Sequence, residues 1–387
     1  MVVNWPAQAG VPGLRMLLVI FSVFSLALSF PFHLEHLERQ LNSSAEVSRL
    51  ADSAIYTYSR ITYGESCSDD QQLYIEQELD EMIKLLQVTT QNIGNLQFYL
   101  EHTVQPENWG ANYDYISKLL ATWQAYMGVI QLTDETQPYP WGQHVYSFTE
   151  AIDKMDDLIG IYNIILDELN NGGPDISIDC NDEHYVRRQP REGEDPNLRY
   201  YTDTRPEGQS SGTYTLGATG GLCHESQGGT NGWSVRNRVT GRDEVCICPA
   251  AFERARTSQM LQDLSNDANT LKGVSINTLK LRTIVGTLLH EFTHVQGILG
   301  TPTRDLVFNI PAGPNGRWPA KSEPSYRGEG CRALAGAQPH LTLQNADSLA
   351  YFAVASWYDA CDWSSNFCGQ AKDNLKTEDG FVTFDFN

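Results

Sequence analysis

The stretch "TLLHEFTHVQG", Thr287 to Gly297, sets two histidines four residues apart, with a glutamate directly after the first. In an α-helix, residues at this spacing lie one turn above each other, so His290 and His294 would project from one face and reach the same metal ion. Apolar residues recur at helical intervals from Asn277 to Ile298. We therefore predict one helix over 277–298 that carries a binding site for a single Zn²⁺ ion.

The glutamate of the motif, Glu291, suits the role of a general base. Zinc lowers the pKa of bound water from about 15.7 to about 7, so a nearby carboxylate can take its proton and pass it to a leaving amine. Zinc also polarises a carbonyl group. The three residues together favour peptide hydrolysis, and the alternative is a pair of histidines packed at a helix surface without a metal.

The motif leaves one protein ligand unassigned, because a catalytic zinc site normally has three protein ligands and one open position. One metalloprotease class supplies a glycine three residues and a histidine six residues after the second motif histidine. Gly297 fits the first position, but Gly300 stands at the second. We therefore expect a carboxylate further along the chain.

The composition excludes some partners. Acidic residues outnumber basic ones 48 to 27 among the 387 residues, which gives a formal net charge of -21. Such a balance argues against binding to the phosphate backbone of a nucleic acid. A protein or peptide substrate remains the expected partner.

The N-terminus is typical of a secretory signal peptide. Arg15 precedes an apolar run, Met16 to Leu28, that ends in small residues and is shorter than the ~20 residues needed to span a bilayer. We expect residues 1–29 to be a signal peptide, the protein to be secreted and extracellular, and no stable membrane association. Residues 30–62 are either a removable propeptide or an N-terminal helix.

The cysteine count suits an oxidising compartment. An even number of cysteines in a secreted chain favours structural disulfides over a cysteine metal site. The eight are Cys67, Cys180, Cys223, Cys246, Cys248, Cys331, Cys361 and Cys368.

The chain changes character near its middle. Helical periodicity extends over 69–101, 112–130 and 148–169, and "NGGP" then ends the last of these segments. The short β-branched segments "DISIDC", "SGTYTLGAT" and "DEVCIC" predict a small sheet, and 186–212 is expected to be a polar loop. We predict an α+β fold over 63–365 and a C-terminal tail over 366–387.

Segments on both sides of the motif carry a family resemblance. "SEPSYRGEGCRALAG" (322–336) and "LQNADSLAYFA" (343–353) follow it, whereas "YGESCSDDQ" (63–71) and "EVCICPAAF" (244–252) precede it. Together with "TLLHEFTH" they resemble the deuterolysin-like, or aspzincin, family of secreted fungal zinc metalloendopeptidases. The resemblance implies a mainly helical zincin-like fold and a hydrolase activity on peptide bonds.

The resemblance also implies a third zinc ligand. In the family, Gly-Thr after the motif helix is followed by an aspartate ligand and, three residues later, by a tyrosine. Tyr326 matches the tyrosine, and counting back three residues leads to Glu323, which the resemblance therefore implies as the ligand. Zinc accepts either carboxylate.

Two other carboxylates remain possible ligands. Asp305 lies closer to His294 and follows the Gly-Thr pair at 300–301, but it has Phe308 where the tyrosine should be. Asp347, in the "NAD" segment, is the third candidate.

The same resemblance implies further roles. Tyr326 would donate its hydroxyl group to the oxyanion formed during hydrolysis; the alternative is a packed core tyrosine. Asp347 would bind substrate, because the lysine-specific branch of the family pairs this aspartate with an acidic residue three positions later. Ala350 stands at the later position, so the lysine pocket is incomplete, and Asp347 would either favour basic side chains or simply hold the loop.

The resemblance also implies disulfides. Cys67 would pair with Cys180, and Cys223 would pair with Cys246 or Cys248.

The sequence as a whole predicts a secreted zinc metalloendopeptidase with His290, His294 and Glu323 as ligands. One alternative is an inactive secreted relative that acts as an interaction protein, which the altered third ligand and the long insertion before Glu323 would favour. The other is a zinc protease of the glutamate-ligand class.

Overall fold

The computed structural model describes residues 58–102, 110–131, 145–206, 213–216, 222–225, 229–237, 239–255, 261, 265–310, 321–369, 377–378 and 381–382. All of them belong to one unit that runs from Tyr56 to Asn387. The predicted signal peptide and most of segment 30–62 lie outside the described residues. Among the described residues, no helix has both the length and the hydropathy of a membrane span.

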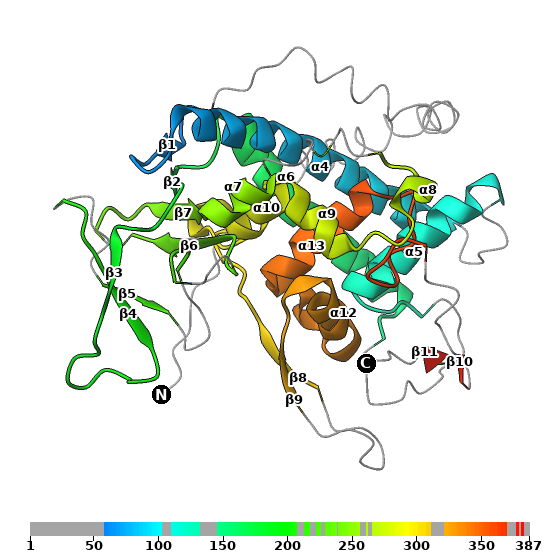
Figure 1. Ribbon diagram of the computed structural model, residues 1–387. Coiled ribbons are helices and arrows are strands. Elements are labelled where there is room, and N and C mark those ends of the chain that lie inside the picture. The colour runs from blue at the N-terminus through cyan, green and yellow to red at the C-terminus, as the bar shows by residue number, and fades with distance from the viewer. Residues whose placement is uncertain are drawn as a thin grey trace, which may run out of the picture. The chain divides into compact units, whose positions relative to one another are not determined.

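The fold is α+β, with helices as the larger part, as predicted (Figure 1). The helical elements are α4 (Asp69–His102), η2 (Gly110–Asn112), α5 (Tyr113–Tyr126), α6 (Phe148–Asn170), α7 (Pro249–Ala255), α8 (Ala268–Leu271), α9 (Ile276–Arg282), α10 (Val285–Thr293), α11 (Gln296–Leu299), α12 (Arg327–Ala337), η6 (Pro339–Gln344) and α13 (Ala346–Trp357). The strands are β1 (Thr62–Tyr63), β2 (Ile176–Asp179), β3 (Tyr185–Arg188), β4 (Arg199–Asp203), β5 (Thr213–Leu216), β6 (Gly232–Arg236), β7 (Asp243–Ile247), β8 (Val307–Ile310), β9 (Lys321–Pro324), β10 (Thr377–Glu378) and β11 (Phe381–Val382).

The largest sheet has the strand order β1-β2-β7-β6. β1, β2 and β7 are parallel, whereas β6 pairs antiparallel with β7 and forms one edge. Alternate residues of β7 face opposite sides of the sheet. Val245 and Ile247 join the helical core, while Glu244 contacts Tyr185 and Arg205 on the other side.

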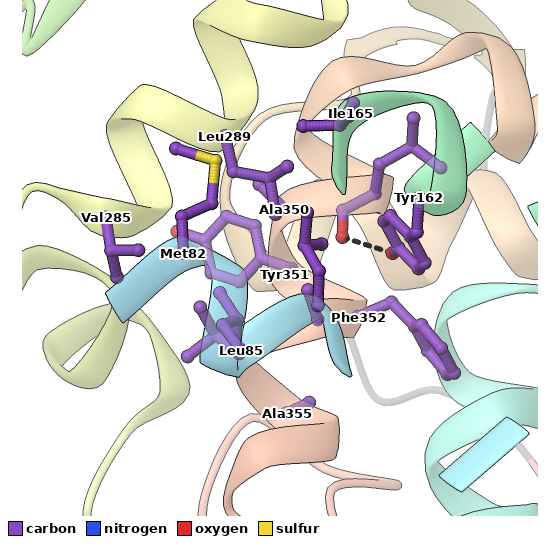
Figure 2. Packing of buried hydrophobic residues seen from close by; sticks show 14 of the residues in the cluster. Met82, Leu85, Tyr162, Ile165, Val285, Leu289, Ala350, Tyr351, Phe352 and Ala355 are labelled. Carbon is purple, nitrogen blue, oxygen red and sulfur yellow. Dashed lines mark hydrogen bonds between the residues drawn. The ribbon is translucent and has the colours of Figure 1, made fainter. Parts of the chain in front are cut away.

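The core forms where the long helices cross. α4 contacts α6, α10 and α13, and α10 packs against α13 and β6. Figure 2 shows side chains of α4, α6, α10 and α13 meeting in this cluster. The hydroxyl group of Tyr162 donates a hydrogen bond to the carbonyl of Leu349. Burial of the apolar stripes of these helices holds α10 in place, and α10 carries the histidine motif.

The predicted single helix over 277–298 is wrong, because the structure divides it into α9, α10 and α11. Thr283 ends α9 in an extended conformation (φ -128°, ψ 168°). The buried carboxylate of Glu78 then accepts a hydrogen bond from the backbone N–H of Val285 at 3.0 Å, which satisfies a donor that the first turn of α10 leaves free. A tertiary contact therefore sets the start of the motif helix.

The prediction of a polar loop over 186–212 is also wrong in part. Val186 to Arg188 lie in β3, and residues 199–203 form β4, which pairs antiparallel with it. Tyr185 and Tyr201 are buried and build a small second cluster with Leu222. The many charged residues of this segment obscured its strand pattern, in which tyrosines form the apolar face.

Three disulfides are present among the described residues: Cys67–Cys180, Cys223–Cys248 and Cys361–Cys368. The first confirms the expected pairing, and the second selects Cys248 over Cys246. Cys246 and Cys331 are free and buried. The last disulfide and the bridge between Ser275 and Phe367 join residues 367 and 368 to earlier parts of the chain.

Candidate metal centre

α10 brings the two motif histidines together. His290 lies in its last turn and His294 is its C-terminal cap, still in a helical conformation (φ -83°, ψ -11°), so the four-residue spacing keeps its geometry. The two Nε2 atoms lie 3.2 Å apart. Nδ1 of His290 donates to Asp347 Oδ1 at 2.9 Å, and Nδ1 of His294 donates to the carbonyl of Thr303 at 3.1 Å, since both partners can only accept. The Nε2 atoms are therefore the ring nitrogens that a metal would bind, in place of any proton they carry.

The chain after α11 turns back toward this helix. Gly300 makes the turn with a φ of 68°, a conformation that favours glycine. Thr303 then pairs with the end of α10: its N–H donates to the carbonyl of Thr293, and the hydroxyl groups of the two threonines lie 2.7 Å apart. The carbonyl of Arg304 accepts from the N–H of Ala346. These bonds fix the backbone immediately before Asp305.

Asp305 completes a triangle of ligand atoms. Its Oδ1 lies 3.3 Å from Nε2 of His290 and 3.4 Å from Nε2 of His294. Zinc bound tetrahedrally at about 2.0–2.1 Å from each ligand atom would space those atoms about 3.3 Å apart. The three distances in the structure, 3.2, 3.3 and 3.4 Å, match that spacing. The residues present therefore fit a zinc ion.

The charged groups of the site favour a bound cation. Burial alone would lower the pKa of His290, but the charge of Asp347 and hydrogen bonds to Asp305 and Asp347 outweigh it and raise the pKa to about 10. Burial would raise the pKa of Asp305, yet its bonds to the two histidines hold it far below its usual range. A divalent cation among the three groups would satisfy the same field without a proton.

Glu291 lies beside the triangle of ligand atoms, but its carboxylate is not one of the three. Its Oε1 is 3.9 Å from Nε2 of His290, farther than the carboxylate of Asp305. Glu291, His290 and His294 are close enough to be considered as a metal-binding group in their own right. We favour Asp305 as the ligand because it is nearer to the ring nitrogens. Burial raises the pKa of Glu291, which suits a group that exchanges protons.

Tyr326 comes directly after a hairpin whose base lies near the same site. β8 and β9 pair antiparallel, and the N–H of Ser325 donates to the carbonyl of Leu306 at the base of the hairpin. This pairing returns Tyr326 to the neighbourhood of Asp305. Burial raises the pKa of the Tyr326 hydroxyl well above its usual range, and the charge of Asp305 and a hydrogen bond to it add to the effect. Tyr326 is 46% exposed, so it is not the packed core tyrosine of the alternative interpretation.

Glu323, the third ligand that the resemblance implied, belongs to the hairpin. It lies in β9, where its backbone pairs with Phe308 of β8. The chain after Asp305 includes β8 and β9, which pair as a hairpin. Counting back three residues from Tyr326 therefore ends on a strand of this hairpin. The contacts with the two histidines come from Asp305, and the structure thus favours this residue over Glu323 as third ligand.

Asp347 is placed behind the first histidine rather than facing an open pocket. It is 4% exposed, and its Oδ1 accepts from Nδ1 of His290 and from Nζ of Lys280 at 2.6 Å. Its Oδ2 accepts from the N–H of Arg327 at 2.8 Å. Ala350 belongs to the apolar cluster in Figure 2 and is fully buried. These contacts give Asp347 a structural role behind His290.

The first residue of the "NAD" segment ties the hairpin to the helices. Oδ1 of Asn345 accepts from the hydroxyl group of Ser325 at 2.6 Å and from the N–H of Leu306 at 3.3 Å. Its Nδ2 donates to the hydroxyl group of Ser348 at 2.9 Å. Asn345 therefore holds the base of the hairpin, next to both Asp305 and Tyr326.

Sequence reasoning missed three contributors to the site: Thr303, Lys280 and Gly232. A methyl group added to Gly232 in β6 would stand 3.1 Å from Oε1 of Glu291. Thr303 could have been suspected from the sequence, because it follows the Gly-Thr pair by only two residues. Nothing in the sequence pattern links Lys280 or Gly232 to the histidines.

A second group of possible ligand atoms lies on the other side of the sheet, formed by Asp182, Cys223 and Cys246. The sulfur of Cys223 is already bonded to Cys248. Both oxygens of Asp182 accept hydrogen bonds, including one from the indole N–H of Trp233 at 2.9 Å and one from the N–H of Cys223 at 2.5 Å. With the disulfide intact, this group does not offer three free ligands.

Comparison with models of known protein families finds no match to this chain, and comparison with curated proteins finds none either.

Proposed function

We propose that the protein is a secreted zinc metalloendopeptidase with a zincin-like fold. The observation that carries the proposal is the triangle formed by Nε2 of His290, Nε2 of His294 and Oδ1 of Asp305, whose sides suit tetrahedral zinc. Three ligand atoms from two histidines and a carboxylate leave a fourth position open, as catalytic zinc sites require.

Each group at the site has a role in hydrolysis. Zinc bound there would polarise the scissile carbonyl and lower the pKa of water. Glu291 takes the proton of the attacking water and gives it to the leaving amine. Tyr326 stays protonated because its pKa is raised, so its hydroxyl group can donate to the oxyanion as it forms.

The edge of the main sheet offers a place for an extended substrate. Among the described strands, β6 is paired on one side only, with β7, and it contacts α10. Extended peptides commonly add to such an edge through main-chain hydrogen bonds. Gly232 at the start of β6 lies beside Glu291, so a peptide along this strand would pass the catalytic base.

Secretion forms part of the proposal. The three disulfides fit an oxidising compartment. The signal-peptide pattern at 1–29 adds support from the sequence.

The alternative of an inactive relative drew on a changed third ligand. Its other ground was the long insertion, which lies between Asp305 and Tyr326 in the chain. With Asp305 as the proposed ligand, the site needs no change from aspartate to glutamate. The same finding counts against the glutamate-ligand class. We therefore keep the active enzyme as the proposal.

Proteolysis of an unfolded protein such as reduced casein tests the activity. We expect the wild-type protein to cleave it, a chelator to stop cleavage and added Zn²⁺ to restore it. Glu291→Gln keeps the size of the side chain and removes the base, so it should bind zinc normally and cleave at least 100-fold more slowly, on the order of a lost general base. Equal cleavage by both proteins would contradict the proposal.

A further inference from the structure

Lys280 is a buried cation at the back of the metal centre. It lies in α9, and its ammonium group contacts Oδ1 of Asp347 at 2.6 Å. The side chains of both residues are less than a tenth exposed. The same carboxylate oxygen accepts the hydrogen bond from Nδ1 of His290. A chain of contacts thus leads from Lys280 through Asp347 to a ligand of the proposed zinc ion.

The surrounding residues are shaped to hold this lysine. A methyl group at position 286 would lie 2.7 Å from Cγ of Lys280, so glycine at the start of α10 makes room for the aliphatic stem. The ammonium group also lies 4.6 Å from the centre of the Tyr351 ring, at a distance typical of a cation–π contact. Burying an ammonium group is costly unless it is paired, and Asp347 supplies the pair.

Lys280 affects His290 through Asp347, whose other carboxylate oxygen also has a fixed partner. The N–H of Arg327 binds its other oxygen at 2.8 Å, and Arg327 holds a φ of 62°, which is unusual for a residue with a side chain. Lys280 and Arg327 together restrain both oxygens of the carboxylate. A restrained carboxylate behind a ligating histidine fixes its tautomer and ring orientation.

We propose that Lys280 is a positioning residue of the metal centre: it holds Asp347 so that this carboxylate orients His290 toward zinc. This inference rests on the proposed function, because it requires that His290 binds the metal. It also predicts that Asp347 does not bind a substrate lysine, since Lys280 of the same chain already occupies the carboxylate.

The test measures the dissociation constant for Zn²⁺ by competition with a chromophoric chelator. Groups that support a zinc ligand typically contribute 10–100-fold to metal affinity. We expect Lys280→Met and Asp347→Asn each to weaken zinc binding by about that factor. In the Asp347→Asn background, Lys280→Met should cause no further loss, because Lys280 acts through Asp347.

Lys154→Met is the matched control. Lys154 is a second buried lysine, whose ammonium group donates to Met127, Tyr146, Pro339 and Thr342 rather than to Asp347. It should lower thermal stability and leave the zinc affinity of the folded protein unchanged. An equal loss of zinc affinity in this variant would show a general effect of removing a buried lysine and would overturn the proposal.

Two other results would also overturn the positioning role alone. One is a zinc affinity of Lys280→Met equal to that of the wild-type protein. The other is a double variant whose loss of zinc affinity equals the product of the two single losses. If Lys280→Met does not fold, the charge-neutral double variant is compared with Asp347→Asn, and a further loss of affinity contradicts the proposal. A wild-type protein that binds no zinc contradicts the proposed function itself, which separates the two failures.

Discussion

Gly232 lies directly against Glu291: a methyl group on its α-carbon would stand 3.1 Å from Oε1 of Glu291, and 3.0 Å from both Cγ2 of Thr287 and the carbonyl oxygen of Cys246. These separations are tighter than ordinary van der Waals contact. The backbone of the edge strand therefore leaves just enough room for the glutamate of the motif.

Gly232→Ala should displace Glu291 without removing a ligand. The carbonyl of Cys246 is part of β7 and cannot easily move, so the glutamate side chain is the group that gives way. We expect kcat/KM on a peptide substrate to fall at least 10-fold, because small misplacements of catalytic groups carry costs of this order. Zinc affinity should stay unchanged. Gly160→Ala in α6 meets nothing within 4 Å and serves as the control; equal activity of both variants would contradict the expectation.

Tyr326→Phe should lower kcat with little change in KM or zinc affinity. Loss of one donor to a developing oxyanion costs roughly 100- to 1,000-fold in kcat. Tyr326 is 46% exposed, so stability should hardly change. Tyr113→Phe, at a comparably exposed tyrosine (51%), should behave as wild type. Steady-state kinetics of the two variants give the comparison, and a wild-type kcat for Tyr326→Phe would rule out the donor role.

The cleavage sites in an unfolded protein should show no preference for lysine or arginine. Asp347 is buried against Lys280, and Ala350 lies in the apolar core, so neither offers a negative charge to a substrate. Mass spectrometry of the products maps the sites. Strong enrichment of lysine next to the cleaved bond would show that another acidic pocket, or a rearranged Asp347, binds the substrate.

Glu78 should make the stability of the protein depend on pH. Burial raises its pKa to about 7, above the ordinary value of 4.5. The folded state therefore holds a proton that the unfolded state releases between pH 4.5 and 7, so this contribution is complete below pH 4.5 and is lost as the pH rises to 7. The loss is on the order of 3 kcal/mol.

Glu78→Gln should remove that part of the pH dependence. Urea unfolding at pH 4.5 and 7.5 gives the free energy of unfolding for each protein. Glu76→Gln, two residues earlier on α4 and partly exposed, should keep the wild-type slope. The same slope in Glu78→Gln would mean that Glu78 does not carry the proton.

Local patterns predicted much of the fold. The spacing of His290, Glu291 and His294 depends only on helix geometry, and the apolar periodicity of α4 and α6 placed these helices within a residue or two. β2, β5 and β7 also coincide with the predicted strands. Such features follow from residues close together in the chain.

The remaining features depend on contacts between distant residues. Glu78 sets the start of α10 from 207 positions away, so periodicity alone predicted one long helix. The choice of third ligand depended on whether the insertion comes before or after that ligand in the chain. Counting back from Tyr326 could not distinguish a hairpin inserted after Asp305 from a loop inserted before Glu323. The pairing of Lys280 with Asp347 likewise appears only when α9 and α13 pack together.

Zinc content of matched ligand variants tests the central claim most directly. We expect the purified wild-type protein to hold one Zn²⁺ per chain by atomic absorption after dialysis, Asp305→Ala to lose it, and Glu323→Ala to retain it. Far-UV circular dichroism should show all three folded. Retained zinc in Asp305→Ala together with loss in Glu323→Ala would contradict the assignment of the metal centre, and absence of zinc from the wild-type protein would contradict the zinc peptidase itself.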